Sequence, residues 1–201
     1  GKVTSFGKSK VKTADSSGNL LSNGVNTYDS TGSYYYLDSG SYYLGGSSDV
    51  LEVSGPYNRP VYTKPNSTVN LCLNGKGIYS STSYNDGIIT ISNKNNIAVT
   101  DCSENETGNI YNPYSSNFGR GVWVASDASF TLWRGKIRNV WANTSSYASS
   151  GYYNGGGVYV TGGKFTMNGG SISKATSYKG NGGGVYVDSG EFIMNGGTIT
   201  G

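Results

Sequence analysis

Gly155-Gly-Gly-Val-Tyr-Val160 returns 27 residues further along the chain as Gly182-Gly-Gly-Val-Tyr-Val187. The same shift carries Phe165 onto Phe192, and the residues around the two phenylalanines match as well. A fixed period of roughly 20 to 50 residues is typical of solenoids, in which each repeat is one unit that stacks on the next. The two stretches therefore predict two successive turns of a solenoid.

A third, longer copy precedes these two. Its Gly121-Val-Trp-Val124 lies 36 residues before the matching part of the next copy, which is nine residues more than the later spacing. One extra residue falls between Val124 and Phe130, and eight fall between Ile137 and Val158. Solenoids accept insertions in the loops that join their strands. We therefore expect the eight extra residues to lengthen a loop.

Each copy contains three short segments in which apolar and polar residues alternate. In the middle copy they are Val158–Val160, Phe165–Met167 and Ser171–Ser173. Alternation is typical of a half-buried strand, and glycines at the joints, such as Gly162-Gly163, disfavour a helix. Three strands per coil of about 27 residues predict an all-β fold, a right-handed parallel β-helix whose strands pair with their equivalents one turn away at about 4.8 Å.

The alternation also separates inner from outer side chains, because successive side chains of a strand point to opposite faces. We expect the inner side chains to stack in columns along the axis. They are Val122, Val124, Phe130, Leu132 and Ile137 in the first copy, Val158, Val160, Phe165, Met167 and Ile172 in the second, and Val185, Val187, Phe192, Met194 and Ile199 in the third. Asn168-Gly169 and Asn195-Gly196 are expected at corners, where both residue types tolerate a positive φ.

The first third of the chain is less regular. Two tyrosine-rich stretches, 32–37 and 40–44, and the apolar stretch Val50–Val53 predict short strands. We interpret residues 1–68 as an irregular N-terminal β cap packed on the solenoid, and residues 69–201 as the coils of the parallel β-helix. No proline-rich or charge-rich linker divides the chain, so we expect a single structural domain.

Four segments of the sequence resemble those of a known family. They are Asn70-Leu-Cys-Leu-Asn-Gly-Lys76, Val99-Thr-Asp-Cys-Ser103, Asn181-Gly-Gly-Gly-Val-Tyr-Val187 and Phe192-Ile-Met-Asn-Gly-Gly-Thr-Ile-Thr200. Together they resemble the β-helix (pectin-lyase-like) domains of large cell-surface adhesins of Gram-positive and gut bacteria, over residues 69–201. The resemblance implies an extracellular, non-catalytic domain that binds a host or matrix glycan or protein. It also implies stalk domains of the same polypeptide and anchoring to the cell wall through parts of the protein outside this chain.

An enzyme is the first alternative, because β-helices also include polysaccharide lyases and glycosidases. The chain has no histidine, which removes the commonest general base, the serine triad and the usual zinc ligands. Asp101, Glu104 and Glu106 would then be the candidate carboxylates for a glycosidase pair. We favour a solvated polar loop for this segment. A structural spacer of a surface stalk is the second alternative.

No cofactor, metal, nucleic acid or membrane insertion is expected. The glycine-rich segment before Asp188 does not keep the spacing of the calcium-binding nonapeptide. No stretch approaches the ~20 apolar residues of a membrane span. Four lysines that precede Asp15 suggest a contact with a polyanion, but a solvated terminus is the favoured interpretation.

The two cysteines, Cys72 and Cys102, are 30 residues apart, which is about one coil. They could therefore lie on adjacent turns. A disulfide and two buried free thiols both stay open at this point.

Aromatic residues are the candidate ligand-binding residues. The outer column is expected to comprise Trp123, Tyr159 and Tyr186, and the insertion after Ile137 adds others near the same coils: Trp141, Tyr147, Tyr152 and Tyr153. Trp133, at a corner of the first copy, completes the set. Aromatic rings beside hydroxyl and amide donors are the surface on which sugars bind. The alternative is that the column only stabilises the sheet through cross-strand contacts.

Overall fold

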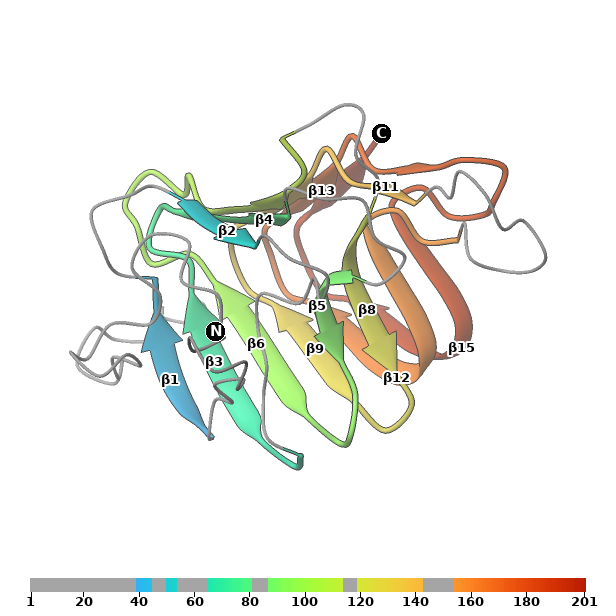
Figure 1. Cartoon of the computed structure of the whole chain (residues 1–201), viewed down its shortest axis with the longest axis horizontal. Coiled ribbons are helices and arrows are strands. Elements are labelled where there is room, and N and C mark those ends of the chain that lie inside the picture. Colours follow the sequence, from blue (N-terminus) through green and yellow to red (C-terminus); the bar gives the residue numbers. More distant parts are fainter. Residues whose placement is uncertain (1–38, 45–49, 54–64, 81–86, 114–118, 143–153) are drawn as a thin grey trace.

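The computed structural model describes residues 39–44, 50–53, 65–80, 87–113, 119–142 and 154–201. Over these ranges every regular element is a strand, and the strands coil into a right-handed parallel β-helix (Figure 1). No helix of the length and apolar character needed to cross a membrane occurs in the described part of the chain. The predicted fold class is therefore confirmed.

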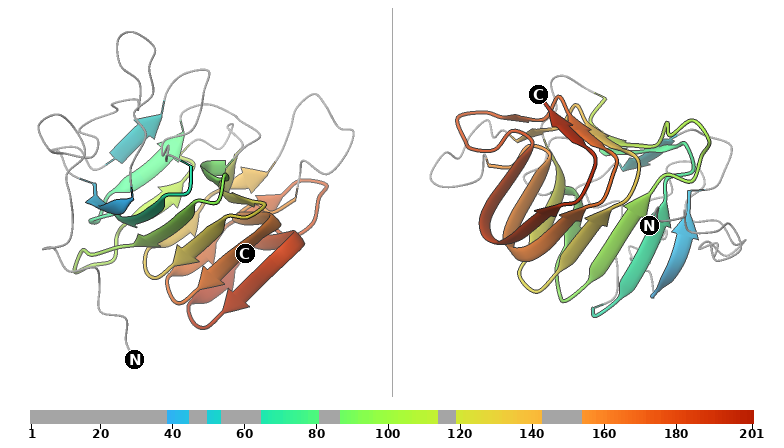
Figure 2. Two further views of the ribbon diagram at one scale, coloured as in Figure 1. Left: turned by 90° about the horizontal axis from the view of Figure 1, so that it is seen from below. Right: turned by 180° about the vertical axis from the view of Figure 1, so that it is seen from behind.

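Three faces make up the coil, and every strand pair within them is parallel. The first face consists of β5 (Gly87–Ile91), β8 (Arg120–Ala125) and the first halves of β12 (Val158–Met167) and β15 (Val185–Met194). The second face consists of β1 (Gly40–Tyr43), β3 (Thr68–Cys72), β6 (Asn96–Thr100), β9 (Ser129–Leu132) and the second halves of β12 and β15. Figure 2 shows how these strands follow one another along the axis.

The third face is a separate six-stranded sheet. Its strands are β2 (Val50–Val53), β4 (Gly77–Ser80), β7 (Asn109–Tyr111), β10 (Lys136–Arg138), β13 (Ser171–Ser173) and β16 (Thr198–Thr200). Beside it lies a short parallel pair, β11 (Trp141–Ala142) and β14 (Thr176–Ser177).

The predicted columns exist in the predicted register. Val158 is the Cα partner of Val122 on one side and of Val185 on the other, and Phe165 is the partner of Phe192. The inner residues of the first two copies are fully buried: Val122, Val124, Phe130, Leu132, Ile137, Val158, Val160, Phe165, Met167 and Ile172. A dry apolar column along the axis is thus the core of the molecule.

In the coil of β15 and β16, three inner residues are exposed, Val187 to 37%, Met194 to 47% and Ile199 to 36%. Val185 and Phe192 are partly buried against the core of the preceding turn.

One joint differs from the prediction. The two strands expected at Val158–Val160 and Phe165–Met167 are one continuous strand, β12, because a β-bulge at Thr161 and Gly162 turns the backbone without breaking its pairing. In the first copy, where this joint has one residue more, β8 and β9 are separate strands. There Asp127 takes a positive φ of 59° and closes a turn.

A close approach between two faces explains the glycine before the first valine of each copy. A Cβ placed on Gly157 would lie 2.6 Å from Cγ2 of Ile172, the inner residue of the third face. The same conflict, at 2.5 and 2.6 Å, arises for Gly121 against Ile137 and for Gly184 against Ile199. These positions therefore require glycine for space.

The expected corner residues do lie at a corner, but the positive φ falls one residue later than predicted. Gly170 has a φ of 74° and Gly197 a φ of 89°. Asn168 and Asn195 stack instead, with Nδ2 of Asn195 donating a hydrogen bond to Oδ1 of Asn168 at 2.8 Å. The left-handed residue is thus the second glycine of each Asn-Gly-Gly sequence.

Strands of the region assigned to the cap continue the sheets of the coil. β1 pairs in parallel with β3, Gly40 opposite Val69, and β2 pairs in parallel with β4, Val50 opposite Gly77. The second and third faces therefore begin before residue 69. The strand expected at 32–37 lies outside the described residues.

Candidate functional site

The aromatic column on the first face is the first candidate site. Trp123, Tyr159 and Tyr186 are outward residues of β8, β12 and β15 and are direct Cα partners. The ring centroids of Trp123 and Tyr159 are 6.0 Å apart, and those of Tyr159 and Tyr186 are 5.8 Å apart with the planes 25° from parallel. The predicted column is therefore real, and all three rings are partly accessible to solvent.

A buried arginine lies against this column. Arg120, at the start of β8, is 2% exposed, and its Cζ lies 4.6 Å from the ring centroid of Tyr159 and 5.8 Å from that of Trp123. Its Nε donates a hydrogen bond to the carbonyl oxygen of Asn154 at 2.8 Å. A cation over an aromatic ring is attracted to the ring's negative face, more strongly where water is excluded. Arg120 thus fixes the position of Tyr159 and covers part of its ring.

A hydrogen bond fixes the indole of Trp123. Its Nε1 donates to Oγ1 of Thr161 at 2.8 Å, across to the next turn. The hydroxyl of Ser126 donates to the carbonyl oxygen of the same Thr161 at 3.1 Å. The β-bulge at Thr161 therefore positions the polar groups beside the aromatic column.

The electrostatic surroundings of Tyr159 favour its protonated form. Burial raises the pKa of the Tyr159 hydroxyl above its usual value of 10.0, and the nearby Asp188 carboxylate raises it further. The Arg120 guanidinium acts in the opposite direction, and Tyr186 adds a smaller increase to the pKa. Tyr159 is therefore a hydrogen-bond donor throughout the physiological pH range.

The remaining predicted aromatic residues do not join the column in the described part of the chain. Trp133 follows β9 at the corner between the second and third faces, away from the first face, and its amide donates to the carbonyl oxygen of Val99. Trp141 lies in β11 and exchanges two backbone hydrogen bonds with Gly119, directly before β8. Its Nε1 is buried and has no partner among the described residues. Tyr147, Tyr152 and Tyr153 lie outside the described residues.

A second aromatic column, on the third face, was not predicted. Tyr79 of β4 and Tyr111 of β7 are Cα partners with ring centroids 5.6 Å apart, and Cζ of Arg138 in β10 lies 5.3 Å from the ring centroid of Tyr111. The signal in the sequence is the recurring Ile-Tyr of Ile78-Tyr79 and Ile110-Tyr111, which matches Ile137-Arg138. Tyr79 and Tyr111 are 32 residues apart and lie outside the three glycine-rich copies, so the 27-residue repeat does not reveal this column.

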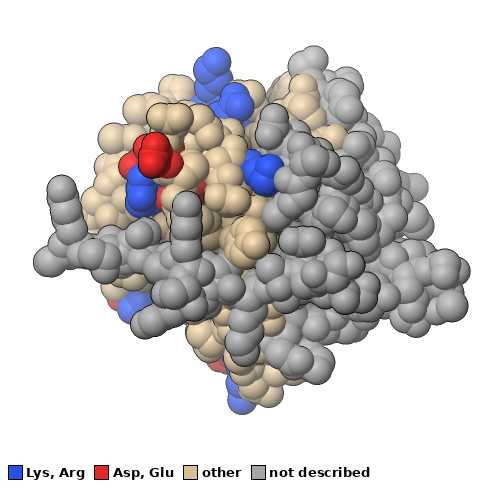
Figure 3. Space-filling model, turned by 90° about the vertical axis from the view of Figure 1, so that its left-hand side faces the viewer, with Lys and Arg blue, Asp and Glu red and all other residues tan. Residues whose placement is uncertain are grey.

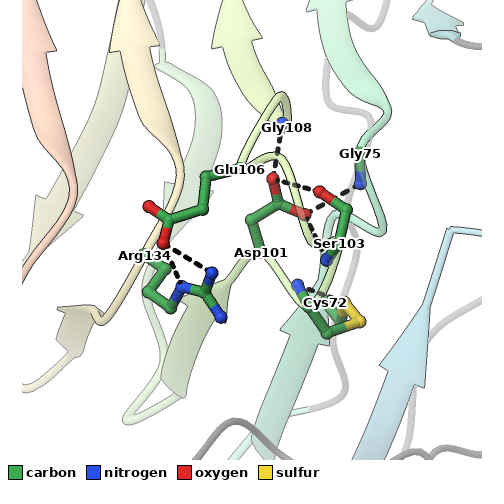
Figure 4. A network of polar contacts seen from close by, with 8 residues as sticks. Cys72, Gly75, Asp101, Ser103, Glu106, Gly108 and Arg134 are labelled. Atoms are coloured by element: carbon green, nitrogen blue, oxygen red, sulfur yellow. Dashed lines mark hydrogen bonds and ion pairs between the residues drawn. A yellow bond between two sulfur atoms is a disulfide. The ribbon is translucent and has the colours of Figure 1, made fainter.

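Asp101 is buried, whereas residues 104–107 of the same segment are exposed, as the interpretation of a solvated loop expected. Asp101 is 0% exposed, and its carboxylate accepts hydrogen bonds from the amides of Gly75 at 2.8 Å and Gly108 at 2.6 Å (Figure 4). The amide and hydroxyl of Ser103 donate to it as well, at 3.1 and 3.0 Å. The bond from Gly75 joins the preceding turn to that of Asp101, and the other three lie within residues 101–108, so the carboxylate is a structural acceptor.

The other two carboxylates of this segment do not combine with Asp101 into a glycosidase pair. Glu106 accepts two hydrogen bonds from Arg134, from Nε at 3.0 Å and from Nη2 at 2.5 Å (Figure 4). Glu104 is exposed. In the described ranges, no group of three His, Cys, Asp or Glu side chains is arranged to hold a metal ion.

The two cysteines form a disulfide. Cys72, at the end of β3, and Cys102, one turn away, have their Cα atoms 5.8 Å apart. The sulfur of Cys72 also accepts a hydrogen bond from the amide of Cys102 at 3.1 Å. Of the two possibilities left open by the sequence, the structure therefore shows the pairing.

Charged side chains are sparse. Uncharged residues make up most of the described surface at the end of the molecule that carries β1 (Figure 3). Two exposed ion pairs join neighbouring turns: Arg134 with Glu106, and Lys164 with Glu191 at 2.9 Å. The second pair joins direct Cα partners of β12 and β15.

Comparisons of the chain with protein-family models, with curated proteins and with solved structures found no match in any of the three. The resemblance to the β-helix domains of bacterial adhesins therefore stays a hypothesis that rests on the four sequence segments named above.

Proposed function

We propose that this chain is a non-catalytic adhesin domain that binds a glycan or protein of a host or matrix through the aromatic column of Trp123, Tyr159 and Tyr186. The observation that carries the proposal is the geometry of this column. Its three rings follow one another along the axis at ring distances of 6.0 and 5.8 Å and are fixed by Arg120 and Thr161. A fixed, partly exposed row of rings needs little further ordering when a ligand binds.

The chemistry beside the rings suits a sugar. The hydroxyls of Tyr159, Tyr186 and Thr161 can donate or accept hydrogen bonds, and the rings offer apolar surface to the C–H groups of a pyranose. Asp188 adds an acceptor next to Tyr159. The same surface would also suit a protein partner, since tyrosine and tryptophan are enriched at protein interfaces.

Two observations support an extracellular location. The disulfide between Cys72 and Cys102 persists in oxidising compartments. The surface is poor in charge and rich in small polar residues, as we expect of a secreted domain. Attachment to a bacterial cell wall through other parts of the protein belongs to the proposal on the strength of the resemblance alone.

A glycan array and a panel of matrix proteins, probed with the whole chain, test the proposal. We expect a specific signal that falls about tenfold in Tyr159→Ala and in Tyr186→Ala, since a stacked ring is worth about 0.5–1.5 kcal/mol beyond the area it buries, and tenfold in affinity is about 1.4 kcal/mol. Tyr111→Ala, which removes a ring from the third face, is the matched control and should keep the signal. Cleavage of a bound glycan would instead support the enzyme alternative.

A structural spacer is the second candidate, and one observation favours it. Tyr159 contacts a ring on either side and a guanidinium besides, so the column also stabilises the sheet. If the array and the panel show no ligand while Tyr159→Ala lowers the free energy of unfolding, the spacer is the better description.

A further inference from the structure

Three cations on and beside the third face have no acidic partner among the described residues. They are Lys136 and Arg138, both outward residues of β10, and Lys174, which follows β13. None of them makes an ion pair with a residue that the structure describes, whereas Arg134 and Lys164 are each paired with a glutamate. An unpaired group of like charges attracts a partner of the opposite charge.

Arg138 is held in a fixed orientation. Its Nε donates to Oδ1 of Asn109 at 2.7 Å, and its guanidinium lies over the ring of Tyr111 at 5.3 Å. The two terminal Nη groups make no hydrogen bond within the described part of the chain, and the residue is only partly buried. A planar guanidinium with both Nη groups available binds a carboxylate or sulfate with two parallel hydrogen bonds.

Lys136 and Lys174 flank this arginine. Lys136 is two residues before Arg138 on the same face of β10, which places the two Cα atoms about 6.6 Å apart. Lys174 takes a positive φ of 48° at the corner after β13, in the position that Asn139 occupies one turn earlier with a φ of 53°. Lys174 is therefore one turn from Arg138 along the axis and exposed at its corner.

Hydroxyl groups continue the two outer rows of the third face. One row runs from Lys136 through Ser171 to Thr198, and the other runs from Arg138 through Ser173 to Thr200. These four hydroxyls make no hydrogen bond with other described residues, and neighbouring rungs lie about 4.8 Å apart. A flat surface of cations, an aromatic ring and free hydroxyls matches a chain of sugars that carry acidic groups.

We propose that the third face is a separate binding surface for an acidic polysaccharide, with Arg138 as the anchor for a carboxylate or sulfate and with Lys136 and Lys174 as secondary contacts. The inference does not depend on the aromatic column of the first face. Nucleic acid fits less well, because proteins that bind it tightly neutralise about 6–10 phosphates, and this face has three cations.

Binding of the whole chain to immobilised heparin and to polygalacturonate tests the proposal, with dextran and double-stranded DNA as comparisons, at low and at raised salt. Heparin carries sulfates and polygalacturonate carries carboxylates only, so the two arms distinguish the anion. We expect salt-dependent binding to at least one of them, none to dextran and much weaker binding to DNA. Arg138→Gln should weaken binding about tenfold and Arg138→Lys by less, because lysine keeps the charge and loses the bidentate geometry.

Arg134→Gln and Lys164→Gln are matched controls, since each removes the same charge from a cation that is already paired. Both should bind within about twofold of the unchanged chain, and Tyr159→Ala should leave this binding intact. Equal losses in Arg134→Gln and Arg138→Gln, binding to DNA as tight as to the polysaccharides, or no binding to either polysaccharide at low salt would overturn the proposal. A loss in Tyr159→Ala alone would assign the acidic glycan to the first face.

Discussion

The rings of Phe165 and Phe192 lie 4.9 Å apart, centroid to centroid, with their planes 10° from parallel. Phe130 continues the stack on the other side of Phe165 at 5.3 Å. Phe165 is therefore enclosed by rings above and below, while Phe192 has a ring on one side and the open end of the coil on the other. The three side chains have the same chemistry and differ in their surroundings.

Truncation of these rings should reveal that difference. Phe165→Ala leaves a cavity in a fully buried column and should lower the free energy of unfolding by about 3–5 kcal/mol. Phe192→Ala should cost about half of that or less, because this ring is only partly removed from water. Thr166→Ala, on the outer side of the same strand, should stay within about 0.5 kcal/mol. Urea unfolding followed by circular dichroism gives the three values, and equal losses at both phenylalanines would contradict the stacking account.

The disulfide should contribute measurably to stability. Replacement of both Cys72 and Cys102 by alanine should lower the free energy of unfolding by about 3.5 kcal/mol, the loop-entropy value for a closed segment of this length. Alkylation of the unfolded, unreduced chain followed by mass spectrometry gives the independent check. Two labelled thiols in protein from an oxidising compartment would show that the pair does not form.

Loss of the Asp101 carboxylate should loosen two turns together. Asp101→Ala leaves the buried amide of Gly108 without its acceptor and removes the acceptor of the Gly75 amide, and unsatisfied buried donors cost roughly 1–3 kcal/mol each. We expect a loss of at least about 3 kcal/mol and faster hydrogen exchange at both amides. Glu104→Gln, an exposed change of charge in the same segment, should alter neither measurement. Unchanged exchange at Gly75 and Gly108 in Asp101→Ala would contradict the bonding pattern.

Ionisation of Tyr159 should make the fold sensitive to alkaline pH. Because the pKa of Tyr159 is higher in the folded chain than its usual 10.0, its contribution to stability is complete below about pH 10 and is lost as the pH rises through the folded-state pKa. The difference in phenolate absorbance between the unchanged chain and Tyr159→Phe isolates this titration among the tyrosines.

Asp188 supplies the control for this titration. Asp188→Asn removes a negative charge beside the hydroxyl and should lower the pKa of Tyr159 relative to the unchanged chain, while burial continues to raise it. A Tyr159 that ionises below pH 10 in the folded chain would show that the ring is more accessible to water than the structure indicates.

The repeat in the sequence predicted which side chains of successive turns lie directly over one another. Val158 and Phe165 have partners at a fixed distance along the chain, and a parallel coil turns that distance into vertical contact. The bulge at Thr161 was not predictable from alternation, since the same joint is a turn between β8 and β9 in the first copy. The joint of the first copy is one residue longer, and this difference in length decides whether the joint is a turn or a bulge.

Contacts made by residues outside the glycine-rich copies escaped prediction. Asp101 looked solvated because its neighbours in the sequence are polar, yet Gly75 of the preceding turn and Gly108 of its own turn supply the donors that permit its burial. Tyr79 and Tyr111 meet across turns that are 32 residues apart, and although Arg138 follows Tyr111 by 27 residues, Tyr111 lies outside the glycine-rich copies. The cysteines stayed ambiguous because spacing brings them close without fixing their oxidation state.

The bridge between Cys72 and Cys102 has a mechanical consequence. A parallel coil that is pulled at its two ends can peel away turn by turn, because each rung is held to the next only by strand hydrogen bonds and side-chain contacts. The covalent link spans 30 residues, which would extend to roughly 100 Å as a free chain. Those residues cannot contribute to lengthening under tension, so a domain exposed to shear keeps one loop of fixed size between the β3 and β6 turns.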